Sequence, residues 1–177
     1  YKRQIKSSTD TNPIIMGIIL GGIITVVGTA PLSSMALTAL LGLTGVPMAI
    51  GAMAAFSSAF MNGTLFHRLK LGDRKSTISV SIEPLSQADI VSANPIPVYV
   101  TNFFGGAAAG LIIALSGMIN DATGTATPIA GFLVMFGFNS PMKVIIYGVV
   151  MAIVGGLAGF LGSVSYTHLT LPTILLV

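Results

Sequence analysis

The chain has 177 residues, of which 53% are apolar and only 7% are charged, whereas roughly 25% of an average soluble domain is charged. This composition excludes a soluble globular domain and a disordered chain, and the lack of cysteine excludes a disulfide scaffold and thiolate metal sites. Eight basic residues are too few for a nucleic-acid-binding surface. We therefore predict an integral membrane protein.

Four uncharged segments are long enough to cross a bilayer, whose core of about 30 Å takes roughly 20 helical residues. They are Pro13–Ala30, Pro47–Phe66, Val98–Ile119 and Val144–Gly162. Three of them carry glycines four positions apart, a spacing that lets helix backbones approach closely in lipid, although chance is an alternative among 21 glycines. The pairs are Gly17 and Gly21, Gly106 and Gly110, and Gly155 and Gly159. The predicted fold class is an all-α, multi-span helical bundle.

Two further apolar segments, Leu32–Leu43 and Pro128–Phe138, are too short to span and are bounded by proline and glycine. Such segments are typical of re-entrant or broken helices, which membrane proteins tolerate where protein or a water-filled cavity surrounds them. The alternative is a helix lying on the surface or in a loop. We expect Asp121 to cap the second short helix rather than to take part in catalysis.

The basic residues predict the orientation, because lysine and arginine accumulate on the cytoplasmic side. One cluster precedes the first span and another follows the second, so we expect both on the same side with an even number of crossings between them. Lys143 conflicts with this scheme: either Pro128–Phe138 crosses the membrane, or Lys143 faces outward or into the protein. The clusters consist of Lys2, Arg3 and Lys6, and of Arg68, Lys70, Arg74 and Lys75.

Polar side chains are concentrated in residues 76–97, where Pro84, Pro95 and Pro97 interrupt any long helix. An acidic residue near membrane depth is expensive and usually faces a cavity, a partner or a substrate. Carboxylate and amide groups suit a polyhydroxylated ligand such as a sugar. Alternatively, this segment is a cytosolic loop whose carboxylates are solvated or pair with Arg68 or Lys75. The candidate substrate-binding residues are Glu83, Gln87, Asn94 and Asn102.

Other motifs have weaker functional interpretations. His67 could relay protons or accept a phosphoryl group, but an interfacial histidine in a basic loop is the commoner case. The run Asn62-Gly63-Thr64 matches the glycosylation pattern yet lies within a predicted span. The sequence contains no metal-ligand spacing, nucleotide-binding motif or catalytic nucleophile motif. We predict no catalytic residue, no metal site and no cofactor.

We divide the chain into three parts. Residues 1–12 are predicted to be a cytoplasmic segment, and residues 13–162 form the transmembrane domain. The opening residues read like the middle of a longer protein. Residues 163–177 include the string VSYTHLTLPT, which resembles a translated sequencing adapter, so we expect this tail not to be native; a genuine helix or strand end is the alternative.

Four motifs, taken in order, resemble the EIIC-like membrane domain of the bacterial phosphotransferase system. They are APLSS, LGLTGVP, SIEPLSQADIVSANPIPVYV and GTATPIAGF. The resemblance covers about residues 12 to 162 and corresponds to the C-terminal portion of a family member, without its N-terminal spans. More narrowly, the chain resembles a subgroup of this family that is labelled as a toxin regulator.

This resemblance implies a homodimeric sugar permease subunit in the bacterial cytoplasmic membrane. A cytosolic IIB partner, supplied by IIA and ultimately by phosphoenolpyruvate, would phosphorylate the bound sugar. The dipeptides Glu83-Pro84 and Asn94-Pro95 are similar to those of sugar-transporting members, although Ile82 stands where asparagine is usual. The alternatives are a non-transporting membrane sensor that regulates gene expression and an ion-coupled transporter.

Overall fold

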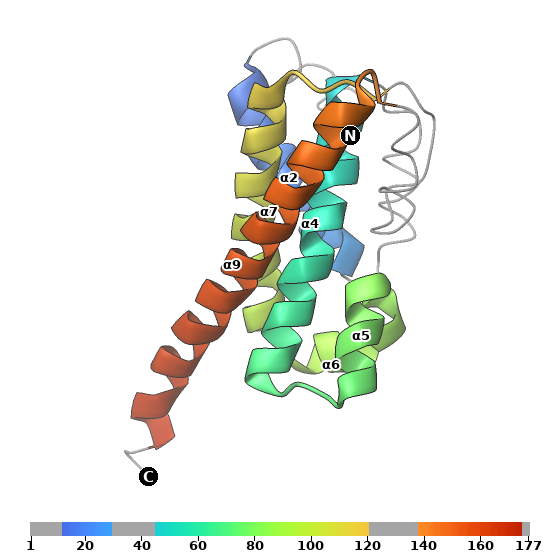
Figure 1. The fold of residues 1–177 in the computed structure, drawn as a ribbon. Coiled ribbons are helices and arrows are strands. Elements are labelled where there is room, and N and C mark those ends of the chain that lie inside the picture. The colour runs from blue at the N-terminus through green and yellow to red at the C-terminus, as the bar shows by residue number, and fades with distance from the viewer. Residues whose placement is uncertain (1–11, 30–44, 121–137, 175–177) are drawn as a thin grey trace.

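Four helices pack side by side in the structure, a computed structural model that describes residues 12–29, 45–120 and 138–174 (Figure 1). Three of them are long and apolar enough to cross a membrane, and the other is a shorter apolar helix of 17 residues. No strand occurs in these described ranges, so the prediction of an all-α, multi-span fold is confirmed. The helices are α2 (Pro13–Thr29), α4 (Val46–Leu69), α7 (Pro95–Ser116) and α9 (Pro141–Ile174).

Proline lies in the first turn of each of these four helices, where its missing N–H is not needed and its fixed φ suits the helix. Helix α7 therefore begins at Pro95, before the predicted Val98, because Pro95 and Pro97 both fit its first turn. Helix α9 continues beyond the predicted Gly162 and into the predicted tail of residues 163–177, as far as Ile174.

The prolines also divide the polar segment before α7, as predicted. It forms α5 (Arg74–Ile82), a 3-10 turn η1 (Pro84–Gln87) and α6 (Ala88–Ala93). An apolar cluster packs these short elements against the end of α4 and the start of α7. Its buried members are Leu65, Phe66, Val80, Val91 and Val98.

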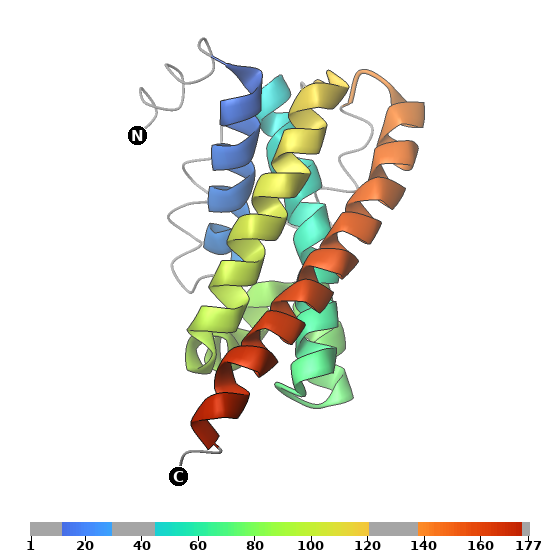
Figure 2. The same ribbon diagram turned by 90° about the vertical axis from the view of Figure 1, so that its left-hand side faces the viewer.

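The two ends of the bundle are distinct. At one, called here the Asn120 end, the backbones of Gly45 and Asn120 exchange hydrogen bonds of 2.9 and 3.1 Å, and Asn139 N donates to the Ile119 carbonyl (3.1 Å). This joins the start of α4, the end of α7 and the start of α9. At the other, the Lys70 end, α4 ends and α7 begins (Figures 1 and 2).

Helices α2 and α4 run in the same direction. Gly17 of α2 lies against Gly110 of α7, and Thr25 further along bonds to Asn102, so α2 is antiparallel to α7. Helix α4 is antiparallel to α7 as well, since it begins beside Asn120 and ends near the start of α7 (Figure 2). The start of α2 and the end of α4 therefore lie at opposite ends of the bundle.

This arrangement corrects the predicted orientation, in which the residues before the first span and those after the second share one side. The reason is that both helices pack antiparallel on α7, which makes them parallel to each other. Thr29 and Gly45, which flank the undescribed residues 30–44, are accordingly at opposite ends. The predicted helix Leu32–Leu43 and Asp121 lie outside the described residues, as does Pro128–Phe138 except for Phe138.

Lys143 lies at the Asn120 end, opposite to the cluster that begins at Arg68. Its Nζ donates to the carbonyl of Ser116 at the end of α7 (3.3 Å). A cation is favourable there because the last carbonyls of a helix carry partial negative charge. Of the alternatives for Lys143, the structure thus has it exposed on the side away from Arg68.

The glycine pairs make close helix contacts, which confirms their packing interpretation. Gly17 and Gly21 face Gly106 and Gly110, and a Cβ added at Gly17 would lie 2.5 Å from the Gly110 carbonyl oxygen. The glycine pair of α9 lies in the same way against α4: a Cβ added at Gly159 would lie 2.9 Å from the Cβ of Thr64. Small residues provide this approach where no hydrophobic force draws helices together.

Candidate functional site

Helix α5 turns back along the last part of α4. The turn uses Lys70, whose φ of 51° ends α4, and Gly72, which lies against Ser76. Asp73 then caps α5, since its side chain accepts a 2.7 Å hydrogen bond from the Ser76 N–H. The same hydrogen bond lowers the pKa of Asp73 below its ordinary value, because it favours the charged carboxylate.

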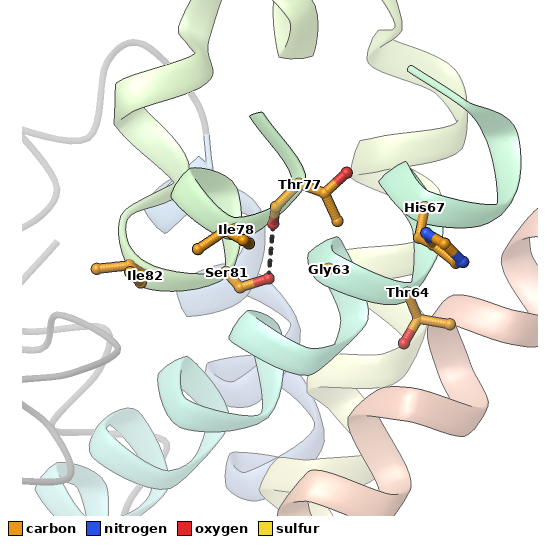
Figure 3. A pocket seen from close by; sticks show the side chains of 7 residues that line it. All are labelled: Gly63, Thr64, His67, Thr77, Ile78, Ser81 and Ile82. Atoms are coloured by element: carbon orange, nitrogen blue, oxygen red, sulfur yellow. Dashed lines mark hydrogen bonds between the residues drawn. The ribbon is translucent and has the colours of Figure 1, made fainter. Parts of the chain in front are cut away.

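A groove of about 420 Å³ runs between α4 and α5 (Figure 3). Gly63 allows the two helices to meet, as a side chain there would collide with the Ser81 hydroxyl. We call this feature the α4–α5 groove. It is lined by Gly63, Thr64 and His67 of α4 and by Thr77, Ile78, Ser81 and Ile82 of α5.

The exposed surface of the groove is mainly apolar, although Thr64, His67, Thr77 and Ser81 contribute polar groups to its lining. Ile78 and Ile82 are 53% and 49% exposed. The hydroxyls of Thr77 and Ser81 both donate to backbone carbonyls, Thr77 to that of the capping residue Asp73 and Ser81 to that of Thr77 at 2.9 Å (Figure 3). His67 lies exposed at the end of the groove nearer the turn, so its imidazole can meet a ligand.

Glu83 lies directly after α5, with its side chain exposed. Because α5 is antiparallel to α4 and Ser81 touches Gly63, Glu83 is carried back to about the level of Gly63. That level is roughly 9 Å along the axis from the end of α4. Within the described residues neither Glu83 nor Asp89 forms an ion pair, so the alternative in which they pair with Arg68 or Lys75 finds no support there.

Gln87 and Asn94 flank α6 and are both half-buried. Gln87 Nε2 donates to the Ser86 carbonyl (2.8 Å), and Asn94 Nδ2 donates to the Ile90 carbonyl (3.0 Å). No donor among the described residues bonds to their side-chain oxygens, which leaves these oxygens able to accept a hydrogen bond from a ligand hydroxyl.

Asn102 is set apart from the other three candidates. It lies fully buried in α7, roughly 12 Å along the helix axis from Asn94. Its Nδ2 donates to Oδ1 of Asn62 in α4 (2.7 Å) and to the Val98 carbonyl (2.9 Å). The structure therefore brings Asn102 to Asn62, and no hydrogen bond joins any two of the four predicted residues in the described chain.

The sequence did not predict a role for Asn62, which stood out only as part of a glycosylation pattern. The α4–α5 groove was not predicted either. One signal was present: Thr77, Ile78, Ser81 and Ile82 recur at the spacing of a single helix face. No group of three side chains able to hold a metal ion occurs among the described residues.

Arg68 of α4 contacts helix α9 rather than the α4–α5 groove. Its Nε donates to Oγ of Ser163 in α9 (2.9 Å), and its guanidinium lies 4.2 Å from the ring centroid of Phe160. Ser163 is itself buried. Arg68 thus fastens the end of α4 to α9.

A protein-family profile described as "Phosphotransferase system, EIIC" matches residues 2–173. Neither the comparison with curated proteins nor that with solved structures gives a match.

Proposed function

We propose that this chain, which belongs to the phosphotransferase system EIIC family, is a sugar permease subunit. In this proposal it binds a sugar within the membrane domain and presents a hydroxyl group to a cytosolic IIB partner for phosphorylation. The protein acts as a homodimer in the bacterial cytoplasmic membrane. Its own residues position the sugar, and the partner carries the phosphoryl group.

The observation that carries the proposal is the position of Glu83. Helix α5 returns it toward membrane depth, and no cation in the described chain neutralises it. A carboxylate in such a place is costly unless it serves a ligand or a partner. The oxygens of Gln87 and Asn94 belong to the same short-helix region, and together the three supply acceptors for several sugar hydroxyls.

Asn102 enters this proposal only through a rearrangement. Its carboxamide is bonded to Asn62, so it would exchange that bond for one to a sugar hydroxyl. The two hydrogen bonds are of similar strength, so the exchange costs little if the ligand replaces what it breaks. Binding of a sugar and loosening of the contact between α4 and α7 would then occur together.

The test is uptake of a panel of radiolabelled sugars by the full-length protein with its phosphotransferase partners. We expect one sugar to be taken up as its phosphate, and Glu83→Gln to reduce its binding at least tenfold. Asp89→Asn, which removes another exposed carboxylate from the same region, should leave binding within twofold. If the two variants behave alike, Glu83 is not in the site.

Two outcomes would overturn the transport function itself. Uptake that follows an ion gradient and ignores phosphoenolpyruvate would make the protein an ion-coupled transporter. Ligand-dependent gene expression that persists without the phosphotransferase partners, in the absence of uptake, would make it a membrane sensor.

A further inference from the structure

We propose that the α4–α5 groove and the basic residues at its end bind an anionic phospholipid of the surrounding bilayer. One acyl chain lies along Ile78 and Ile82, and the phosphate lies beside Arg74 and Lys70. This proposal does not depend on the sugar permease function.

The first argument is that the groove, like a phospholipid, is apolar at one end and charged at the other. Its end near Gly63 and Ile82 points back along α4 toward the membrane interior, whereas its end near His67 and Thr77 adjoins the turn at the Lys70 end (Figure 3). Arg74 precedes Ile78 by four positions and therefore extends the lining face of α5 beyond Thr77. The apolar part of the groove thus faces the depth of acyl chains, and its basic part faces the depth of headgroups.

The second argument is charge. Four basic residues fall within Arg68–Lys75, directly after a membrane-spanning helix, and such clusters attract anionic headgroups. Arg68 is directed to Phe160 and Ser163, which leaves Lys70, Arg74 and Lys75 exposed. The acidic residue in this cluster, Asp73, contributes one negative charge, against the three positive charges of Lys70, Arg74 and Lys75. The headgroup region therefore keeps an excess of positive charge.

The third argument is the shape of the groove. It is open along the flank of the bundle rather than enclosed, and its two large apolar side chains, Ile78 and Ile82, are about half exposed. A chain molecule already present in the bilayer can enter such a groove sideways, whereas a compact polar ligand would find few hydrogen-bond partners in it. These features favour a lipid over a soluble metabolite.

The test is native mass spectrometry of the full chain released from bilayers that contain equal amounts of phosphatidylglycerol and phosphatidylcholine. We expect preferential retention of phosphatidylglycerol. Arg74→Gln should weaken that retention about fivefold, and Ile78→Ser with Ile82→Ser should abolish the preference. Lys143→Gln, which removes one exposed positive charge at the Asn120 end, should change it less than twofold.

Several results would overturn the proposal. Equal retention of both lipids would show that the groove does not select a headgroup. Equal effects of Arg74→Gln and Lys143→Gln would show a diffuse charge effect. A further such result is that inorganic phosphate alone raises the unfolding temperature as much as phosphatidylglycerol does, with both effects lost in Arg74→Gln. That result would show an anion site that does not need a lipid. If the isoleucine variant fails to fold, Ile78→Ala with Ile82→Ala in the same measurement decides the role of the groove.

Discussion

The carboxamides of Asn62 and Asn102 are joined by a 2.7 Å hydrogen bond between α4 and α7, and both side chains are fully buried. Each also keeps one atom, Asn62 Nδ2 or Asn102 Oδ1, that has no hydrogen-bond partner within the described residues. The backbone carbonyl of Asn102 accepts a hydrogen bond from the Thr25 hydroxyl of α2 (2.6 Å). Three helices therefore meet at one polar point inside an apolar bundle.

This geometry predicts strong coupling between the two asparagines. Asn62→Leu or Asn102→Leu alone should lower the unfolding free energy by about 1–2 kcal/mol, because the remaining amide loses its partner in a buried place. The double variant should be more stable than the two losses together predict, by about 0.5–1.5 kcal/mol. Unfolding in mixed detergent measures all four proteins, and additive losses would contradict the coupling.

The contact between α2 and α7 predicts opposite outcomes for two glycines of α2. Gly21→Ala forces a methyl group into the backbone of Gly106, so we expect a loss of about 1–3 kcal/mol. Gly28→Ala meets nothing within 4 Å and should be neutral or stabilising by up to about 1 kcal/mol, since alanine favours helix. Thermal unfolding in detergent compares them. A similar loss in both variants would argue against close α2–α7 packing.

The link between Arg68 and α9 predicts a measurable coupling with Phe160, whose ring centroid lies 4.2 Å from the guanidinium carbon. Arg68→Ala and Phe160→Ala should couple by about 0.5–1 kcal/mol, as expected for an exposed cation–π contact. Arg68→Lys should recover only part of this, because it cannot reproduce the Nε bond to Ser163. A double-mutant cycle with no coupling would place the end of α9 away from α4.

The cap of α5 predicts a pH dependence. The pKa of Asp73 is lowered by its hydrogen bond to Ser76, so its stabilising effect is complete above the pKa of the unfolded chain, about 3.9. It is lost as the pH falls through the lower pKa of the folded state. The protection factors of the α5 amides, which are exchange rates corrected for the intrinsic effect of pH, should therefore fall below about pH 4.

Two variants separate the cap from the charge. Asp73→Ala should lower the protection factors of α5 at neutral pH and remove their acid dependence. Asp73→Ser keeps a capping oxygen and should protect α5 equally at all these pH values. An acid-dependent change that persists in Asp73→Ser would assign the titration to another group.

The sequence predicts Glu83, Gln87 and Asn94 as site residues because polar groups between prolines are conspicuous in an apolar chain, and their role in binding stays a prediction. The partner of Asn102 was not predicted, since Asn62 lies 40 positions away and a hydrogen bond between two helices leaves no local pattern. The groove was missed for the same reason: its two walls are helices whose approach depends on Gly63 meeting Ser81.

The scarcity of charge, the apolar segments and the prolines determined by themselves that this protein is a helical membrane bundle and about where its helices begin. Those features act locally, because helix formation and burial in lipid depend on each segment alone. The tertiary structure decided the directions, with α2 and α4 parallel and Lys143 opposite to Arg68. Direction depends on which glycine faces meet, and Gly17, Gly21, Gly106 and Gly110 can be matched only after the chain has folded.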